Sequence, residues 1–101
     1  MNDEIAFMTI IAGRKQKDAL LTALLEAGVH LINITYGHRP VRAGVLQSTL
    51  GLVPEKAKVV ITCVLPGEKS NEVFAMLAET FHFDKPNTGI AFTVPIEQLS
   101  F

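Results

Sequence analysis

The sequence lacks the features that mark several common classes of protein. Its one cysteine, Cys63, excludes an internal disulfide and suits a reducing compartment. No apolar run approaches the roughly 18 residues that a membrane-spanning helix needs. The acidic start, Met1–Glu4, has no signal-peptide pattern. We therefore expect a cytoplasmic protein that does not insert into a membrane.

Charge is scarce and nearly balanced. Lys and Arg number 9 and Asp and Glu 10, which gives a net charge of −1. Nucleic-acid-binding proteins usually carry a basic surplus, so we expect no nucleic-acid partner. Hydrophobic residues make up 49% of the 101 residues, which excludes a disordered chain. The length predicts one domain over residues 1–101, and the apolar fraction on so small a surface indicates an oligomer.

Hydrophobic periodicity predicts four strands and two helices. The strands are expected at 4–11, 29–36, 58–65 and 89–95, and the helices at 16–27 and, from a Ser70 N-cap, at 70–82. On the first helix, Leu21 and Leu25 are expected to widen an apolar stripe, and Gly28 stands where a C-terminal cap is expected.

A long loop is predicted between the second and third strands. Residues 37–57 contain Gly and Pro without a clear period. Compact domains rarely keep a loop of this length unless it binds something or is disordered. The order βαββαβ predicts a ferredoxin-like α+β fold, a four-stranded antiparallel sheet with both helices on one face.

Both faces of the predicted sheet are apolar. The face expected beneath the helices carries Met8, Ile10, Ile32, Ile34, Val59, Ile61, Cys63, Phe92 and Val94. The other carries Phe7, Thr9, Leu31, Asn33, Val60, Thr62, Val64, Ala91 and Thr93. Because two helices cover only one face, the second face predicts a subunit interface. The alternative is an error of one residue in these strand registers.

Residues that could carry catalysis or bind metal form no known pattern. Cys63 lies mid-strand between apolar neighbours, where a free cysteine usually behaves as a small hydrophobe. The spacings of His30, His38 and His82 with Cys63 match no closed zinc pattern. We therefore expect neither a catalytic residue nor a metal site.

Cations in the predicted loops are better candidates for a binding site. Arg39 and Arg42 lie in the long loop, and Lys56 and Lys58 lie where it rejoins the sheet. The turn Lys85–Gly89 ends in small residues, and backbone N–H groups of such turns can bind an anion. The alternative is a set of solvated loop cations and an ordinary turn.

Three stretches together resemble the PII signal-transduction family. Residues 19–29 with Ile34-Thr35 resemble the family's first helix and second strand. Residues 55–66 resemble the strand after its long T-loop, and residues 85–94 resemble its B-loop and last strand. The match covers nearly the whole chain in order and spacing.

The resemblance implies a homotrimeric regulator of nitrogen or carbon status that is not an enzyme, with ATP or ADP in each cleft between subunits. The T-loop at 37–57 would contact an unknown target protein, through Arg39, Arg42 and Leu46. The implied nucleotide- or anion-binding residues are Asn33, Thr35, Gly37, Arg39, Lys56, Lys58, Lys85, Asn87, Thr88 and Gly89.

The phosphate-binding positions depart from the family pattern. Ile90 stands where the family has its B-loop lysine, and Val60 stands where it has the glutamate that pairs with that lysine. The sequence ends at Phe101, before the family's C-terminal arginines. A triphosphate needs several cations or Mg²⁺, so three outcomes stay open: weak nucleotide binding, binding of another small anion, or no nucleotide.

Other ferredoxin-like classes remain as alternatives. One is a trimer resembling the CutA group, in which histidines and Cys63 bind metal. A second is a small dimeric enzyme with a pocket between sheet and helices and chemistry near Tyr36 and His82. A third is an amino-acid-binding ACT-like module.

Overall fold

A computed structural model of the chain describes residues 5–37, 58–86 and 88–97 as one sheet with two α-helices. The strands are β1 (Ile5–Gly13), β2 (Leu31–Gly37), β3 (Lys58–Pro66) and β4 (Gly89–Ile96). A short 3₁₀ helix, η1 (Arg14–Gln16), leads into α1 (Lys17–Glu26), and α3 (Gly67–Phe81) joins β3 to β4. The predicted long loop falls on residues 38–57, outside the described residues.

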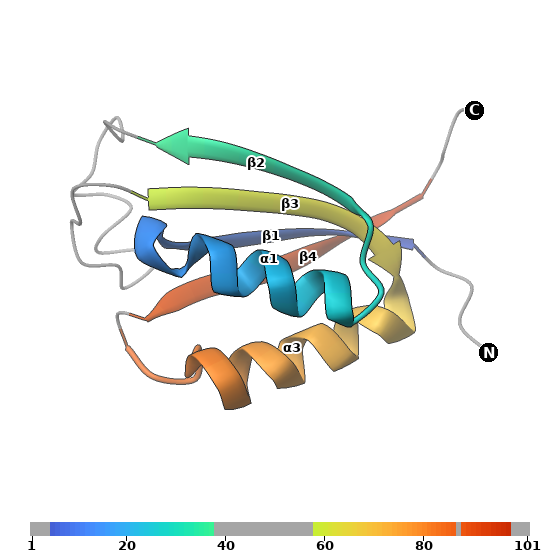
Figure 1. The fold of residues 1–101 in the computed structure, drawn as a ribbon. Coiled ribbons are helices and arrows are strands. Elements are labelled where there is room, and N and C mark those ends of the chain that lie inside the picture. The colour runs from blue at the N-terminus through green and yellow to red at the C-terminus, as the bar shows by residue number, and fades with distance from the viewer. Residues whose placement is uncertain (1–4, 38–57, 87, 98–101) are drawn as a thin grey trace.

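The sheet is antiparallel throughout, in the order β2-β3-β1-β4. Both helices lie on one of its faces (Figure 1). This confirms the predicted ferredoxin-like α+β fold. Within the described part of the chain, neither helix is long and apolar enough to cross a membrane.

The hydrophobic core fills the space between the sheet and the two helices. Alternate residues of β1 and β3 point toward the helices. The helices pack against them with side chains at helical spacing. The largest fully buried side chains include Met8, Ile10, Val59, Ile61, Leu20, Leu24, Val73 and Leu77. Burial of each is worth about 1.5–3 kcal/mol, so this layer holds the helices on the sheet. Leu25 does not join it: its 53% exposure contradicts its predicted place on the stripe.

The end of α1 confirms the predicted glycine cap. Gly28 has φ +91, the left-handed conformation that glycine adopts without steric cost. Its N–H donates to the Leu25 carbonyl, and the Val29 N–H donates to the Leu24 carbonyl, both at 3.0 Å. These two bonds form a Schellman motif. Val29 and Leu24 are both buried, which anchors the chain as it turns into β2.

The start of α3 differs from the prediction. The helix begins at Gly67, with Pro66 in extended backbone before it, and not after Ser70. The Ser70 hydroxyl instead donates to the Gly67 carbonyl at 2.6 Å, inside the first turn. Proline pre-sets the backbone that precedes a helix, so the helix starts one turn earlier than a serine cap would place it.

The predicted faces of β4 are also wrong. Phe92 pairs with Thr9, and Thr93 pairs with Met8, which is buried beneath the helices. Phe92 and Val94 therefore lie on the face away from the helices, and Ala91 and Thr93 lie beneath them. The strand is apolar at both parities, so alternation alone could not fix its register.

Replacing Gly28 with alanine tests the cap. An L-residue at φ +91 pays about 1–2 kcal/mol, so Gly28→Ala should lower the free energy of unfolding by about that amount. Gly13→Ala is the matched control, because Gly13 has φ −70 and an added Cβ would meet no atom of the described residues within 4 Å. Equal unfolding free energies of the two variants in urea titrations would contradict the cap assignment.

Candidate functional site

Most of the described candidate binding residues lie toward one end of the sheet. The backbone register pairs Lys58 with Gly13 on one side and with Gly37 on the other. It also pairs Ala12 with Gly89, the first residue of β4. The ends of β1 and β2 and the starts of β3 and β4 therefore coincide. We call this the loop end of the sheet (left in Figure 1).

The described candidates form two groups. Asn33, Thr35 and Gly37 follow β2 to the loop end, where Gly37 lies beside Lys58. The other group, Lys85, Thr88 and Gly89, belongs to the turn that leads from α3 into β4. The remaining candidates, Arg39, Arg42, Leu46, Lys56 and Asn87, lie outside the described residues.

The two groups do not meet within one protomer. Strands β2 and β4 are the opposite edges of the sheet, with β3 and β1 between them. Three strand spacings separate them by roughly 14 Å. A ligand group shorter than this span could contact both groups only if a second subunit brought the β4 turn of one protomer to the β2 edge of another.

Internal hydrogen bonds hold the described residues of the turn before β4. His82 closes α3 in the left-handed conformation, at φ 61. Its carbonyl accepts hydrogen bonds from the Lys85 N–H at 2.9 Å and from the Thr88 hydroxyl at 2.6 Å. The same hydroxyl lies 2.8 Å from the Lys85 carbonyl. These hydrogen bonds join residues of the turn to one another, and the Lys85 side chain is exposed.

Phe83 packs this turn against the first residue of β4. Its ring lies against Gly89 so closely that a Cβ there would come within 2.4 Å of it. The ring also meets Phe81 edge to face, with centroids 6.5 Å apart. A side chain at position 89 would therefore force the Phe83 ring to shift, whatever the turn binds.

The face of the sheet away from the helices, here called the open face, is apolar, and no other part of the described protomer covers it. Its exposed large side chains are Phe7 (38%), Leu31 (69%), Phe92 (44%) and Val94 (50%). A row of small polar residues, Asn33, Thr62 and Thr9, crosses its middle by direct strand pairing. A hollow of ≈ 430 Å³ lies among Phe7, Leu31, Asn33, Thr62 and Val64.

The departures from the family pattern lie side by side on the open face. Val60 and Ile90 both pair with Ile11, one from each neighbouring strand. The three side chains form a continuous apolar strip toward the loop end. Because these three side chains are uncharged, they need no charged partner and cannot bind a phosphate.

A group of cations at the start of α1 was missed from the sequence. The Arg14 guanidinium lies 4.7 Å from the centre of the Tyr36 ring, and the Lys17 ammonium lies 5.6 Å from it. A hydrogen bond to the Tyr36 hydroxyl raises the pKa of Lys17, with a smaller contribution from Asp18. The signal was three cations within residues 14–17.

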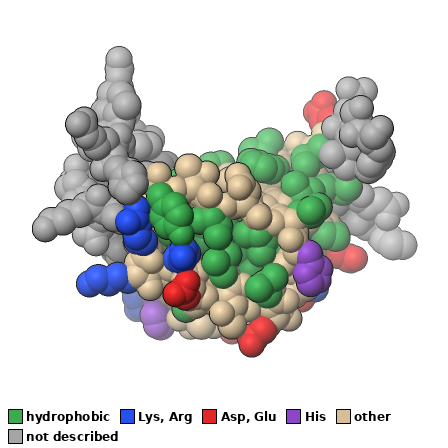
Figure 2. Space-filling view, turned by 45° about the horizontal axis from the view of Figure 1, so that its top comes forward, with side chains coloured by type: hydrophobic (Ala, Val, Ile, Leu, Met, Phe, Trp, Pro, Cys, Tyr) green, Lys and Arg blue, Asp and Glu red, His purple; other side chains and the backbone are tan. Residues whose placement is uncertain are grey.

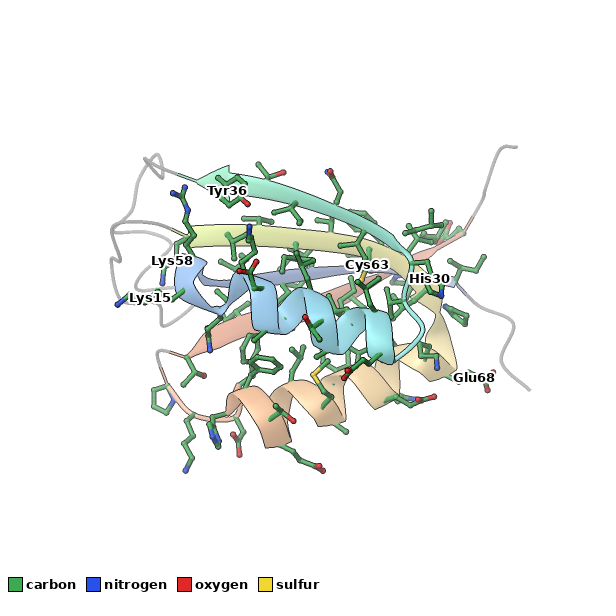
Figure 3. The ribbon with its side chains drawn as sticks, viewed as in Figure 1. Lys15, His30, Tyr36, Lys58, Cys63 and Glu68 are labelled. Atoms are coloured by element: carbon green, nitrogen blue, oxygen red, sulfur yellow. The ribbon has the colours of Figure 1, made fainter. Side chains whose placement is uncertain are left out.

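The described residues proposed for metal binding and for catalysis are not brought together, and His38 lies outside the described residues. Cys63 is 2% exposed, and burial raises the pKa of its thiol, so it stays protonated at neutral pH. His30 lies at the end opposite the loop end (Figure 3), whereas His82 closes α3 near the loop end. Tyr36 is on the β2 edge, away from His82. Over residues 5–37, 58–86 and 88–97, no three His, Cys, Asp or Glu side chains could hold a metal ion.

Comparison with solved structures identifies the fold. A protein of Thermus thermophilus described as PII-like superposes with a TM-score of 0.67, at 18% identity, over 95% of this chain and 91% of the other. The chain has the fold of PII-like signalling proteins. The nitrogen regulatory PII-like protein CPII of Thiomonas intermedia K12, bound to ADP, AMP and bicarbonate, gives a TM-score of 0.69 at 18% identity, over 92% of each chain.

The apo form of CPII gives a similar result, with a TM-score of 0.66 at 17% identity over 92% of this chain and 89% of the other. These neighbours are named as signalling and regulatory proteins. No protein-family model matches the sequence, and no curated protein matches it. The resemblance to the PII family read from the sequence is thus confirmed at the level of the fold.

Replacing Thr88 tests whether its hydroxyl stabilises the turn before β4. Thr88→Val keeps the shape but leaves the His82 carbonyl with one bond fewer, which should cost about 1 kcal/mol of unfolding free energy. Thr88→Ser restores the donor and should recover most of that loss. If thermal unfolding of the valine variant matched the wild type, the hydroxyl would not hold the turn.

Proposed function

We propose that this chain is a PII-like regulatory protein of the cytoplasm. It works as a homotrimer, senses a small molecule between subunits and controls a partner protein through the segment at 37–57. It catalyses no reaction. The observation that carries the proposal is the open face, an uncovered apolar sheet face on a fold shared with PII-like signalling proteins.

The open face supports assembly on energetic grounds. Burial of apolar surface is worth about 25 cal/mol per Å². Four large apolar side chains on this face are exposed in the protomer and would be buried in an interface. The polar row of Asn33, Thr62 and Thr9 supplies hydrogen-bonding groups that fix orientation, which an apolar surface alone does not do.

The division of the candidate site supports a cyclic assembly. A head-to-tail interface that closes into a ring repeats the same contact between all subunits. Such a ring can carry the β4 turn of one subunit toward the β2 edge of the next. Each site would then contain Gly37 and Lys58 from one protomer with Lys85 and Thr88 from its neighbour.

Adenine nucleotide is the proposed ligand. CPII, which shares the fold, is described as bound to ADP, AMP and bicarbonate. The family's B-loop lysine is absent here, so the phosphates would rely on Lys58, Lys85 and the loop cations Arg39 and Lys56. With fewer cations in the cleft, ADP and AMP are favoured over ATP unless Mg²⁺ contributes charge. In this proposal, the nitrogen-regulatory role depends on which target protein residues 37–57 bind.

The first experiment measures the assembly. Sedimentation equilibrium should give the mass of three chains for the wild type. Phe92→Glu places a charge on the open face and should give monomers, because a buried unpaired carboxylate costs several kcal/mol. Leu25→Glu is the matched control, because it adds the same charge at an exposed apolar residue of α1. Trimers with Phe92→Glu, or monomers of the wild type, would contradict the proposal.

The second experiment measures ligand binding on the same protein. Calorimetric titration with ATP, ADP and AMP, with and without Mg²⁺, should give binding to the trimer that the Phe92→Glu monomer lacks. Equal affinity in trimer and monomer would place the site within one subunit. No heat with any nucleotide would remove the proposed nucleotide-sensing role and leave only the assembly.

A further inference from the structure

A second hollow lies on the helix-covered side of the sheet, between α3 and the first half of β4. It encloses ≈ 190 Å³ and is lined by Phe74, Leu77, Ala78, Phe83, Asp84 and Ala91. We call it the α3–β4 pocket. Ala91 belongs to the helix-covered side because it pairs with Ile10, which has no exposed surface beneath the helices. The pocket is therefore separate from the open face and from the hollow on that face.

Small residues on both sides leave the space for this pocket. The positions of β4 that face the helices include Gly89, Ala91 and Thr93. Phe83 packs against Gly89, which leaves Ala91 as the next position along the strand. An alanine also stands on the helix side, at position 78. Because protein interiors are usually filled to close packing, two alanines that line one cavity mark an incompletely packed part of the layer.

The walls of the pocket are apolar apart from one carboxylate. Phe74, Leu77 and Phe83 contribute hydrocarbon, and among the described residues that line the pocket only Asp84 is charged. Asp84 is exposed and forms no ion pair with another described residue. A negative charge beside an apolar cavity complements a ligand that has both a cationic group and an apolar group.

Exposed apolar surface alone would not indicate a ligand on this protein. Figure 2 shows apolar side chains gathered on one side of the protomer, and the open face carries the larger hollow of ≈ 430 Å³. The described residues that line that hollow are uncharged, and the face around it is the proposed subunit interface. The α3–β4 pocket differs in its smaller size, its place on the other side of the sheet and its carboxylate.

The volume of the pocket limits the size of its ligand. An apolar protein cavity of about 150 Å³ can bind benzene. A cavity of ≈ 190 Å³ therefore holds a six-membered ring or a branched aliphatic group with few further atoms. Pockets that enclose drug-sized ligands measure roughly 300–1,000 Å³. A nucleotide is too large for this pocket, so the pocket is distinct from the proposed nucleotide site.

We propose that the α3–β4 pocket binds a small organic amine that carries one aromatic or branched aliphatic group. The apolar group lies between α3 and β4, where its burial drives binding. The ammonium group lies at the exposed side of the pocket and donates hydrogen bonds to the Asp84 carboxylate. The Phe74 and Phe83 rings favour the same sign of charge, because the face of an aromatic ring attracts cations. A ligand that also carries a carboxylate, such as an amino acid, is disfavoured because Asp84 repels it.

Benzylamine and benzyl alcohol test the recognition of charge. The two probes share one ring, but only benzylamine is cationic at neutral pH. Each is titrated into isotope-labelled wild-type protein and followed by backbone amide NMR shifts. Saturable shifts are expected at Ala78, Asp84 and Ala91, with benzylamine bound about threefold more tightly than benzyl alcohol. Equal affinity for the two probes, or the absence of saturable shifts at the pocket, would overturn the proposal.

Two charge variants assign the preference for the amine to one carboxylate. Asp84→Asn keeps the shape of the side chain and should remove the preference for benzylamine while leaving the affinity for benzyl alcohol unchanged. Glu79→Gln is the matched control, because Glu79 is an exposed carboxylate of α3 that does not line the pocket. It should bind both probes as the wild type does. An Asp84→Asn variant that still prefers benzylamine would refute the role of Asp84.

Filling the pocket tests its position independently of charge. Ala78→Leu should abolish the saturable shifts with both probes and leave the thermal midpoint unchanged or higher, because the larger side chain occupies empty space. Ala75→Leu makes the same change at an exposed residue of α3 outside the pocket and should bind as the wild type does. Ala91→Val fills the pocket from β4 and replaces Ala78→Leu in this test if the leucine variant does not fold. Binding that survives in the folded filled variant would exclude this pocket as the site. That result would leave the proposed function unaffected, because neither nucleotide nor the open face takes part in the measurement.

Discussion

Two helices cover one face of a four-stranded sheet, and the other face has no covering layer within the described protomer (Figure 1). The covered face is a dense apolar core in which Met8, Ile10 and Ile61 have no exposed surface. The open face carries Phe7, Phe92 and other large apolar side chains that contact solvent. The core makes the protomer a folded unit, whereas the open face is the reason for proposing that the protomer does not work alone.

The same arrangement sets the geometry of the candidate site. In the strand order β2-β3-β1-β4, the polar residues of β2 lie on one edge and the turn before β4 lies on the other. The described protomer therefore holds these two groups of candidate residues apart. Internal contacts hold the described part of the turn, because the His82 carbonyl accepts two hydrogen bonds and Phe83 packs on Gly89.

Two positions that carry charge in the resembled family are apolar in this chain. The B-loop lysine of the resembled family and the glutamate that pairs with it are replaced here by Ile90 and Val60, which join Ile11 in an apolar strip. At the start of α1, the Arg14 and Lys17 side chains contact the Tyr36 ring.

The sequence by itself determined the element order, the glycine cap at Gly28 and the presence of two apolar sheet faces, because periodicity and steric rules act locally. Only the tertiary structure decided which side chains of β4 face outward, since a strand that is apolar at both parities takes its register from its partner β1. It also brought Tyr36 to Arg14 and Lys17, a contact between residues 19 and more positions apart that no local pattern encodes.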